Sequence, residues 1–315
     1  MRIAFDARMD GAERADWWRA LTDALPDDDW IDAAADGTPS ARWREADVAV
    51  VANPLPGRLA GCTQLKLIQS LWAGVDKLVA DTTLPADVPI ARMVDPAMNR
   101  AMAETATWAV LSLHRHAFDY AAQQRQTQWR PLPQKRAEEV SVLVLGLGQM
   151  GRATALRLAA LGYRVSGWSA RAQEVPGVAT SAGWALLPAA LGNADIVVNL
   201  LPLTDATRGL FDRTRLEQMR PAASLVNLAR GAHVVEKDLL VALNAGRLAH
   251  AVLDVFDAEP LPPTHVFWFH PRVTLWPHVA ARTDLRSAAA VVATNVEAVR
   301  RGEPAAHVAD RTRGY

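Results

Sequence analysis

Three residues that could bind and protonate a small oxo acid each follow an apolar run of the sequence. Arg230 follows SLVNLA, Glu259 comes just after AVLDVFDA, and His278 follows RVTLWP. If these runs are parallel strands of one sheet, their carboxyl ends share an edge and the three side chains converge there. A carboxylate stabilises the imidazolium of a neighbouring histidine, which makes that histidine a general acid, and an arginine can bind a carboxylate. The set suits hydride transfer to a 2-oxo acid.

Each of the three also has an ordinary structural interpretation. Arg230 alone could cap a helix or lie on the surface, and Glu259, directly before Pro260, could belong to a turn. A single histidine at the end of a strand is more often a packing or surface residue than a catalytic one. The joint placement of all three at strand ends favours the functional interpretation.

Three glycines have the spacing of a dinucleotide-binding loop. Gly146, Gly148 and Gly151 form G-x-G-x-x-G directly after an apolar run and directly before a helix-forming run. In that context the first glycine allows a tight turn, the second lets the backbone approach a pyrophosphate, and the third allows close packing of helix and strand. The start of the helix then offers amide groups to the phosphates.

The next strand lacks the acidic residue that usually binds the adenosine ribose. In GYRVSGWSARAQ, residues 162–173, Ser169 stands where that acid is expected, and Arg171 follows two residues later. Without a carboxylate nothing repels a ribose 2′-phosphate, and Ser169 and Arg171 could both donate hydrogen bonds to it. The stretch therefore predicts NADP(H) in preference to NAD(H), although Arg171 could instead be an ordinary solvated residue.

The elements that position these residues follow from the alternation of apolar and helical runs. Residues 1–104 alternate short apolar runs with helical stretches, a helix is expected over 103–125, and the alternation resumes at Val140. This pattern is typical of parallel α/β sheets. We expect two doubly wound domains: a central NAD(P)-binding Rossmann domain over 105–285, and a discontinuous, flavodoxin-like substrate domain over 1–104, completed by 286–315.

Composition narrows the remaining classes. The 34 basic residues balance the 34 acidic residues, which argues against a nucleic acid or membrane-surface partner, and no apolar run approaches the ~20 residues of a membrane span. The N-terminus has no secretory pattern, so a cytoplasmic protein is expected. Cys62 is the one cysteine, and His114 and His116 face different sides of a helix, so no metal site is expected.

Several segments together resemble a known family. GLGQMG, NLARGAHV, LDVFDAEPLPP and HPRVTLWPHVAA are similar to the D-isomer-specific 2-hydroxyacid dehydrogenases, over nearly the whole chain. LWAGVD, QWRPLP and DRTRGY are most similar to the glyoxylate/hydroxypyruvate reductase A group of that family. The resemblance implies the two-domain fold described above.

The resemblance also implies roles for single residues. Arg230 would bind and polarise the 2-oxo acid, Glu259 would tune His278, and His278 would donate the proton. The substrate carboxylate would be held at Trp72, Ala73 and Gly74, the latter two through their amides, and Asp254 would orient the nicotinamide carboxamide. The residues implied to contact the cofactor are Gly146, Gly148, Gln149, Met150, Gly151, Trp168, Ser169, Arg171, Leu201, Pro202, Thr207, Ala229, Asp254, His278 and Ala280.

The sequence departs from the group at three places. The group tends to have an arginine directly after the serine of the second Rossmann strand, whereas here Ala170 stands there and Arg171 follows one place later. Ala52 replaces an aromatic residue that lines the substrate pocket, and Trp276 stands where a small hydroxyl residue is usual. These last two departures predict a pocket of different volume.

The resulting prediction is an NADPH-dependent reductase of glyoxylate, hydroxypyruvate or a similar small 2-oxo acid. One alternative is an NAD-dependent dehydrogenase of a bulkier D-2-hydroxy acid, and another is a nicotinamide-sensing binding protein without catalysis. The intact set of Arg230, Glu259 and His278 favours an enzyme over the sensor. The resemblance also implies a homodimer formed through 103–133, in which Trp129 either reaches the neighbour's active site or packs within its own subunit.

Overall fold

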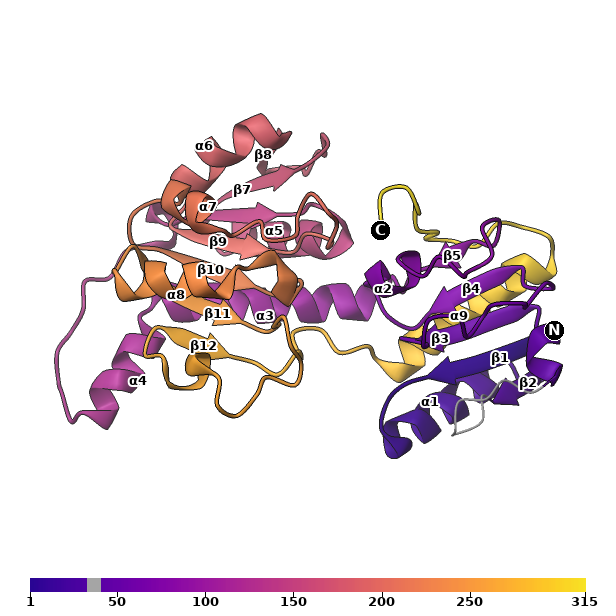
Figure 1. Ribbon diagram of the computed structural model, residues 1–315. Coiled ribbons are helices and arrows are strands. Elements are labelled where there is room, and N and C mark those ends of the chain that lie inside the picture. The colour runs from indigo at the N-terminus through magenta and orange to yellow at the C-terminus, as the bar shows by residue number, and fades with distance from the viewer. Residues whose placement is uncertain (33–40) are drawn as a thin grey trace. The chain divides into compact units, whose positions relative to one another are not determined.

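The computed structural model describes residues 1–32 and 41–315, which form two compact units (Figure 1). Met1–Met98 and Thr283–Tyr315 together make the first, here called the terminal unit, and Asn99–Arg282 make the second, the central unit. The boundaries expected from the sequence were 104/105 and 285/286. Both ends of the chain thus contribute to one unit, and the middle of the chain makes the other.

The terminal unit contains a five-stranded parallel sheet with the strand order β2-β1-β3-β4-β5. This is the flavodoxin-like order, as the sequence predicted. Strand β3 is buried along its whole length, as expected for a parallel strand covered on both faces. The elements are β1 (Arg2–Ala7), α1 (Gly11–Ala24), β2 (Asp29–Asp32), η1 (Ala41–Glu45), β3 (Val48–Ala52), β4 (Leu67–Ser70), α2 (Asp76–Val79), β5 (Ile90–Ala91) and α9 (Leu285–Arg300).

The central unit contains a seven-stranded parallel sheet with the order β12-β11-β10-β9-β6-β7-β8. Counted within the unit, its first six strands have the Rossmann order 3-2-1-4-5-6, so the fold prediction is confirmed. Its strands are β6 (Ser141–Leu145), β7 (Arg164–Ser169), β8 (Ala179–Ala182), β9 (Ile196–Asn199), β10 (Ala223–Asn227), β11 (Leu248–Leu253) and β12 (Val273–Leu275). Its helical elements are α3 (Pro96–His114, beginning in the terminal unit), α4 (Ala117–Arg125), η2 (Ala137–Glu139), α5 (Gln149–Ala160), η3 (Trp184–Leu186), α6 (Leu187–Gly192), α7 (Arg213–Gln218), η4 (Gly231–His233), α8 (Glu236–Asn244) and η5 (Val266–Phe269).

Alternate residues of the strands β6, β9, β10 and β11 enter two separate cores. In β6, Val142 and Val144 pack with side chains of α3 and α5, whereas Leu143 and Leu145 pack with side chains of α6, α7 and α8. Successive side chains of a strand point to opposite faces, so a run of four apolar residues supplies both cores. The sheet is thereby fixed between two layers of helices, which holds the ends of its strands in place.

The single helix predicted over 103–125 is wrong. The chain forms two helices, α3 and α4, and His116, between them, has a φ of 58°. A residue in this left-handed region cannot continue a right-handed helix, so the chain changes direction there. The apolar periodicity of the sequence continues across the break, which is why the pattern alone suggested one helix.

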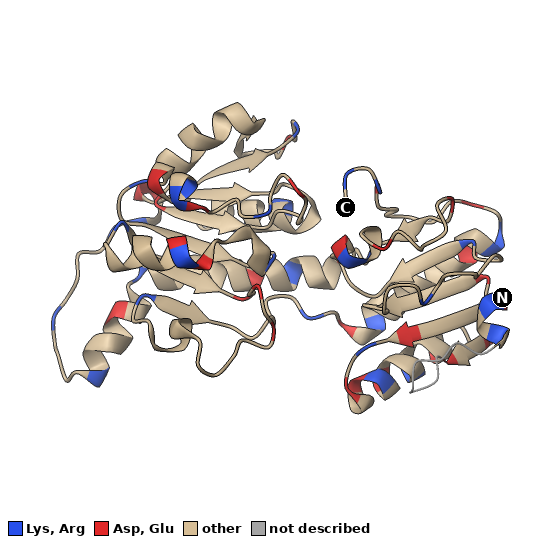
Figure 2. Cartoon of the chain, in the orientation of Figure 1, with Lys and Arg blue, Asp and Glu red and all other residues tan. Residues whose placement is uncertain are grey.

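Charged residues lie mainly on helices and loops, and the strands carry few of them (Figure 2). Across the described part of the chain, no helix is long and apolar enough to cross a membrane. The charges give a formal net charge of zero, since 34 basic residues balance 34 acidic ones.

Candidate active site

The carboxyl edge of the central sheet brings together the three residues that the sequence singled out. Arg230 follows β10, Glu259 follows β11 and His278 follows β12. These three strands are neighbours and run parallel, so the loops after them leave from the same edge. The parallel topology therefore brings residues as far apart in the sequence as positions 230 and 278, 48 residues, to one edge of the sheet.

His278 and Glu259 form a direct pair. Nδ1 of His278 lies 2.8 Å from Oε2 of Glu259, and the two side chains are 51% and 35% exposed. The amide of Phe256 donates to the other oxygen of Glu259, at 2.9 Å. Partial burial raises the pKa of Glu259, but the bonds from His278 and Phe256 and the charges of His278 and Arg230 outweigh it and lower the pKa. Glu259 is therefore an anion at neutral pH.

The backbone at His278 is held by Asp254. His278 has a φ of 54°, and its amide donates to the Asp254 carbonyl at 2.8 Å. The carboxylate of Asp254 accepts the amides of Val279 and Ala280, at 2.8 and 3.0 Å, and the Ala280 carbonyl accepts the hydroxyl of Thr105 at 2.6 Å. Burial raises the pKa of Asp254, and the two amides oppose that rise. The resemblance implied a contact between Asp254 and nicotinamide; the structure adds that Asp254 fixes the turn that carries the histidine.

The loop of Arg230 packs closely on the loop of Glu259. A Cβ added to Gly231 would lie 1.9 Å from the carbonyl carbon of Phe256 and 2.4 Å from the amide nitrogen of Asp257. Only glycine allows this approach, which places Arg230 near enough for its charge to lower the pKa of Glu259. The guanidinium also donates to the carbonyl of Ala229, at 2.8 Å.

Replacing Gly231 by alanine is expected to destabilise the central unit by about 1–3 kcal/mol or more, because backbone atoms must move to admit the methyl group. Urea unfolding followed by circular dichroism measures the change. The matched control is Gly11→Ala, where an added Cβ meets nothing within 4 Å. Equal stabilities of the two variants would show that the loops are not in close contact.

The glycine-rich loop has the geometry of a phosphate site. Gly146 has a φ of 91°, and an added Cβ at Gly151 would lie 1.7 Å from the Gly146 carbonyl oxygen. Gly148 caps α5, and an added Cβ there meets nothing within 4 Å, so open space lies in front of the helix start. Gln149 and Met150 are the first two residues of α5. The amides at this helix start suit a pyrophosphate.

The residues at the end of β7 that were predicted to contact the cofactor differ in their exposure. Trp168 is fully buried in the core and its indole donates to the Gly183 carbonyl at 3.0 Å, so its side chain is not available to a ligand. Ser169 is 8% exposed and its hydroxyl donates to the Arg171 carbonyl at 2.5 Å. The side chain of Arg171 is exposed. Because strand residues alternate between faces, the last two residues of β7 cannot both point toward a cofactor.

The loop after β9 is ordered by its own polar groups. The hydroxyl of Thr207 donates to the Pro202 carbonyl at 2.8 Å, and the amide of Leu201 donates to Oδ1 of Asn199 at 3.3 Å. The side chains of Leu201 and Thr207 in this loop are buried, and so is Ala229 in the loop after β10; all three are 5–7% exposed. Sequence reasoning selected this loop but missed the buried polar residues beneath it, Asn199 among them. The signal available was an asparagine at the end of each of two neighbouring apolar strands, in VVNLL and LVNLA.

The residues predicted to hold the substrate carboxylate lie in the terminal unit. Trp72, Ala73 and Gly74 lie in the loop after β4, one residue beyond the end of the strand. The amide of Trp72 donates to the hydroxyl of Ser70 at 3.0 Å, and its carbonyl accepts the amide of Met93 at 3.0 Å. The loop thus has a fixed backbone at the carboxyl edge of its own parallel sheet.

Trp276 packs within the central unit. Its ring lies against Trp108 of α3, with centroids 4.4 Å apart and planes at 30°. Trp108 in turn contacts Phe118 edge-on, with ring centroids 5.9 Å apart, so Trp108 packs between the two other aromatic rings. The departure at position 276 is therefore accommodated by an aromatic partner on α3.

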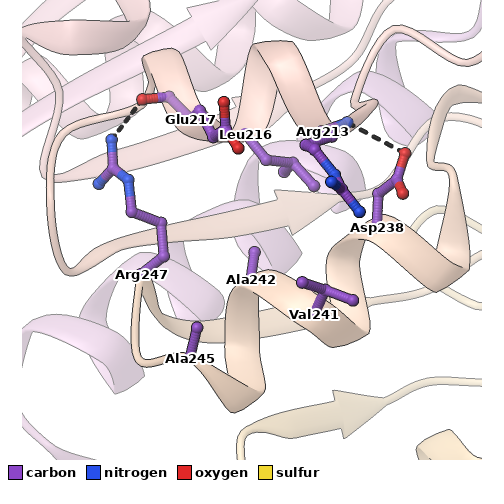
Figure 3. A pocket seen from close by; sticks show the side chains of 8 residues that line it. All are labelled: Arg213, Leu216, Glu217, Asp238, Val241, Ala242, Ala245 and Arg247. Carbon is purple, nitrogen blue, oxygen red and sulfur yellow. Dashed lines mark hydrogen bonds between the residues drawn. The ribbon is translucent and has the colours of Figure 1, made fainter.

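A pocket of about 260 Å³ lies between α7 and α8 of the central unit (Figure 3). Apolar side chains are mixed there with two arginines and two acids, so its formal charges cancel. The guanidinium of Arg247 donates to the Glu217 carbonyl at 2.5 Å, and the amide of Arg213 donates to Asp238 at 3.0 Å. None of the predicted site residues is among those that line it, which are Arg213, Leu216, Glu217, Asp238, Val241, Ala242, Ala245 and Arg247.

Comparisons with known proteins agree with this geometry. Residues 107–280 match the family described as "D-isomer specific 2-hydroxyacid dehydrogenase, NAD binding domain". The glyoxylate/hydroxypyruvate reductase A of Yersinia enterocolitica is 39% identical over 284 residues, which cover 87% of this chain and 91% of the relative. That of Escherichia fergusonii is 40% identical over 313 residues, with 95% and 96% coverage.

Two solved structures have the same fold over essentially the whole chain. A D-isomer specific 2-hydroxyacid dehydrogenase from Xanthobacter autotrophicus, in complex with NADPH and MES, has a TM-score of 0.94 and 39% identity, and the match covers 100% of this chain and 99% of that one. An NADPH-dependent glyoxylate/hydroxypyruvate reductase from Sinorhizobium meliloti, in complex with NADP and sulfate, has a TM-score of 0.91 and 35% identity, with the same coverage. The resemblance expected from the sequence is confirmed: the chain belongs to the D-isomer specific 2-hydroxyacid dehydrogenases, a family of NAD(P)-dependent oxidoreductases.

Proposed function

We propose that this enzyme is an NADPH-dependent reductase of glyoxylate, hydroxypyruvate or a similar small 2-oxo acid. The observation that carries the proposal is the pair of His278 and Glu259, 2.8 Å apart, with Arg230 on the adjacent loop at the same sheet edge. The names of the relatives support the substrate class, because they include glyoxylate/hydroxypyruvate reductases of several bacteria.

In this proposal each of the three side chains has a separate task. Glu259 holds Nδ1 of His278 and stabilises the imidazolium, so His278 gives its proton to the substrate carbonyl oxygen through Nε2. Arg230 binds the oxo acid and polarises its carbonyl. Bound NADPH supplies the hydride that reduces the carbonyl carbon. Trp72, Ala73 and Gly74 hold the substrate carboxylate.

The residues of the central unit fit a nicotinamide dinucleotide. Open space in front of Gly148 and the amides at the start of α5 suit the pyrophosphate. The absence of a carboxylate at Ser169 and the exposed Arg171 favour a 2′-phosphate over bare ribose hydroxyls. Two of the matched structures, those from Xanthobacter autotrophicus and Sinorhizobium meliloti, are complexes with NADPH or NADP.

An absorbance assay at the nicotinamide band tests the proposal. Glyoxylate, hydroxypyruvate and pyruvate are each combined with NADPH and with NADH. Faster oxidation of NADPH with glyoxylate or hydroxypyruvate than with pyruvate is expected. A preference for NADH with a bulkier oxo acid would replace the proposal with a D-2-hydroxy acid dehydrogenase. Cofactor binding without turnover of any oxo acid would indicate a nicotinamide sensor.

Glu259→Gln is expected to move the alkaline limb of the reduction rate to lower pH, by about 1 pH unit or more. The pKa of Glu259 is lowered, so its charge is present throughout the neutral range and supports the imidazolium of His278 there. Glutamine keeps the shape but removes that charge, so the acid form of the pair is lost at a lower pH. Measuring kcat/KM from pH 5 to 10 checks this. An alkaline limb at the same pH in the variant and the wild type would show that Glu259 does not support the protonation of His278.

We also propose a homodimer formed through 103–133. Hydrogen bonds fix the loop after α4. The Pro133 carbonyl lies 3.1 Å from Nε2 of His116, and the Lys135 carbonyl lies 2.8 Å from Nε2 of His114. The amide of Leu132 donates to the hydroxyl of Tyr120 at 2.9 Å. On this anchored loop Trp129 is 97% exposed. Tryptophan is enriched at protein–protein interfaces relative to the rest of the surface, which supports this loop as the interaction surface.

Light scattering at micromolar concentration tests the homodimer, with a monomer as the contradicting result. If Trp129 enters the neighbour's active site, Trp129→Ala lowers kcat/KM while the dimer persists. If Trp129 instead packs only within its own subunit, Trp129→Ala leaves kcat/KM unchanged. The cytoplasmic location expected from the sequence is part of the same proposal, and fractionation of the source cells checks it.

A further inference from the structure

Three buried polar residues link the loops on which the proposed cofactor and substrate contacts lie. Asn199 and Asn227 end the neighbouring strands β9 and β10 and stand opposite each other, and His233 ends η4. All three have 0% exposure. Buried polar groups require hydrogen-bond partners, and a fully satisfied buried network fixes the positions of its members.

The direction of the hydrogen bonds in this network is set by the backbone. Nδ2 of Asn227 donates to the Arg230 carbonyl at 2.9 Å, and its Oδ1 accepts the amide of Ala229 at 3.3 Å. A carbonyl only accepts and an amide N–H only donates, so the Asn227 amide can have one orientation. Its oxygen therefore accepts from Nδ2 of Asn199, at 2.9 Å.

The same reasoning locates the proton of His233. Nδ2 of Asn199 also lies 2.9 Å from Nδ1 of His233, and because Nδ2 only donates, Nδ1 accepts. The ring proton is then on Nε2, which donates to the Pro202 carbonyl at 3.2 Å. His233 is thus a neutral imidazole that accepts on one side and donates on the other. No protonated form can make both bonds.

We propose that His233 is a positioning residue, which holds the loop of Pro202 in register with the loop of Arg230. The inference rests on the proposed function, in which the first loop lines the cofactor and the second binds the 2-oxo acid. At one end, the Pro202 carbonyl accepts from His233 and from Thr207. At the other end, the Arg230 carbonyl accepts from Asn227 and from the amide of His233, the latter at 3.3 Å.

Two substitutions separate the two ends of the network. Asparagine places an amide near the position of Nδ1, so His233→Asn keeps the partner of Asn199 and loses the bond to Pro202. Glutamine places an amide near the position of Nε2, so His233→Gln keeps the bond to Pro202 and loses the partner of Asn199. His270→Asn is the matched control, since His270 bonds Asn244 at the amino ends of β11 and β12, opposite the edge that carries the site.

The measurements are the Kd of NADPH by fluorescence titration and the KM and kcat for glyoxylate. His233→Asn is expected to raise the NADPH Kd by roughly 2- to 10-fold with a smaller change in KM, as loss of one hydrogen bond implies. His233→Gln is expected to raise KM by a similar factor with a smaller change in Kd. The control changes neither value.

A parallel change of both constants in both variants, together with a lower melting temperature, would overturn the proposal, because it would show a merely structural residue. Unchanged constants in both folded variants would overturn it as well. The NADPH titration needs no turnover. If the wild type binds NADPH but reduces no 2-oxo acid, the proposed function fails, whereas the link between His233 and the Pro202 loop is still decided by the Kd of His233→Asn.

Discussion

Substitution of His278 by glutamine is expected to lower kcat for glyoxylate reduction by roughly 10²–10⁴-fold, the range associated with loss of a general acid. Glutamine is close in size to histidine, but its amide lies near the position of Nε2, so it loses the bond that Nδ1 makes to Oε2 of Glu259, at 2.8 Å in the wild type. It cannot deliver a proton at neutral pH. The reaction must then take its proton from water, without a positioned donor.

The NADPH affinity of this variant is expected to stay close to that of the wild type. The turn at His278 is fixed by the amides of residues 278–280, which donate to Asp254, and these bonds do not involve the imidazole. Stopped-flow measurement of a single turnover, together with fluorescence titration of NADPH, separates chemistry from binding. His270→Gln, on a part-buried histidine outside the site, serves as the control. A kcat within a few-fold of the wild type would exclude His278 as the proton donor.

The fold and the catalytic set were accessible from the sequence because both follow from local patterns. Apolar runs alternating with helical stretches determine a parallel α/β sheet, and in such a sheet the ends of neighbouring strands meet. Arg230, Glu259 and His278 could therefore be assigned to one sheet edge without knowledge of any contact between them. The glycine spacing is a local signal for the same reason, since the positive φ of Gly146 and the contact of Gly151 with the Gly146 carbonyl lie within one turn.

What the sequence did not reveal depends on contacts between distant segments. The break at His116 arises from one residue in the left-handed region, within an apolar period that continues on both sides. The pairing of Trp276 with Trp108 joins residues 168 positions apart in the sequence. The bond between Asn199 and His233 likewise requires two loops to be packed before the polar groups meet. No periodicity encodes such pairs.

The burial of Trp168 shows a second limit. The sequence placed Trp168, Ser169 and Arg171 together at one tip, because all three follow the same apolar run. Strand geometry instead turns the indole of Trp168 into the core, where it contacts Trp184 with centroids 5.1 Å apart. The hydroxyl of Ser169 is engaged by the Arg171 carbonyl. Of the two side chains predicted to contact a 2′-phosphate, Ser169 is buried and Arg171 is exposed.

Replacing Arg171 by alanine is therefore expected to raise the KM for NADPH by roughly 10- to 100-fold, the range that corresponds to a hydrogen bond of about 1.5–3 kcal/mol between charged groups. The KM for NADH is expected to change little, since NADH has no phosphate for Arg171 to meet. Alanine keeps the carbonyl to which Ser169 donates, so the variant tests the side chain alone. Arg157→Ala is the control, because Arg157 is exposed near the other end of α5, away from the strand ends.

A carboxylate at position 169 should change the preference further. Ser169→Asp places a negative charge against the 2′-phosphate and within reach of the ribose hydroxyls of NADH, where this fold usually has an acid. The ratio of kcat/KM for NADPH to that for NADH is expected to fall in the order wild type, Arg171→Ala, Ser169→Asp. Circular dichroism of the aspartate variant confirms that the substitution at this buried position leaves the fold intact. If the wild type prefers NADH, or if Arg171→Ala weakens both cofactors equally, the end of β7 is no phosphate site, and the serine at position 169 needs another explanation.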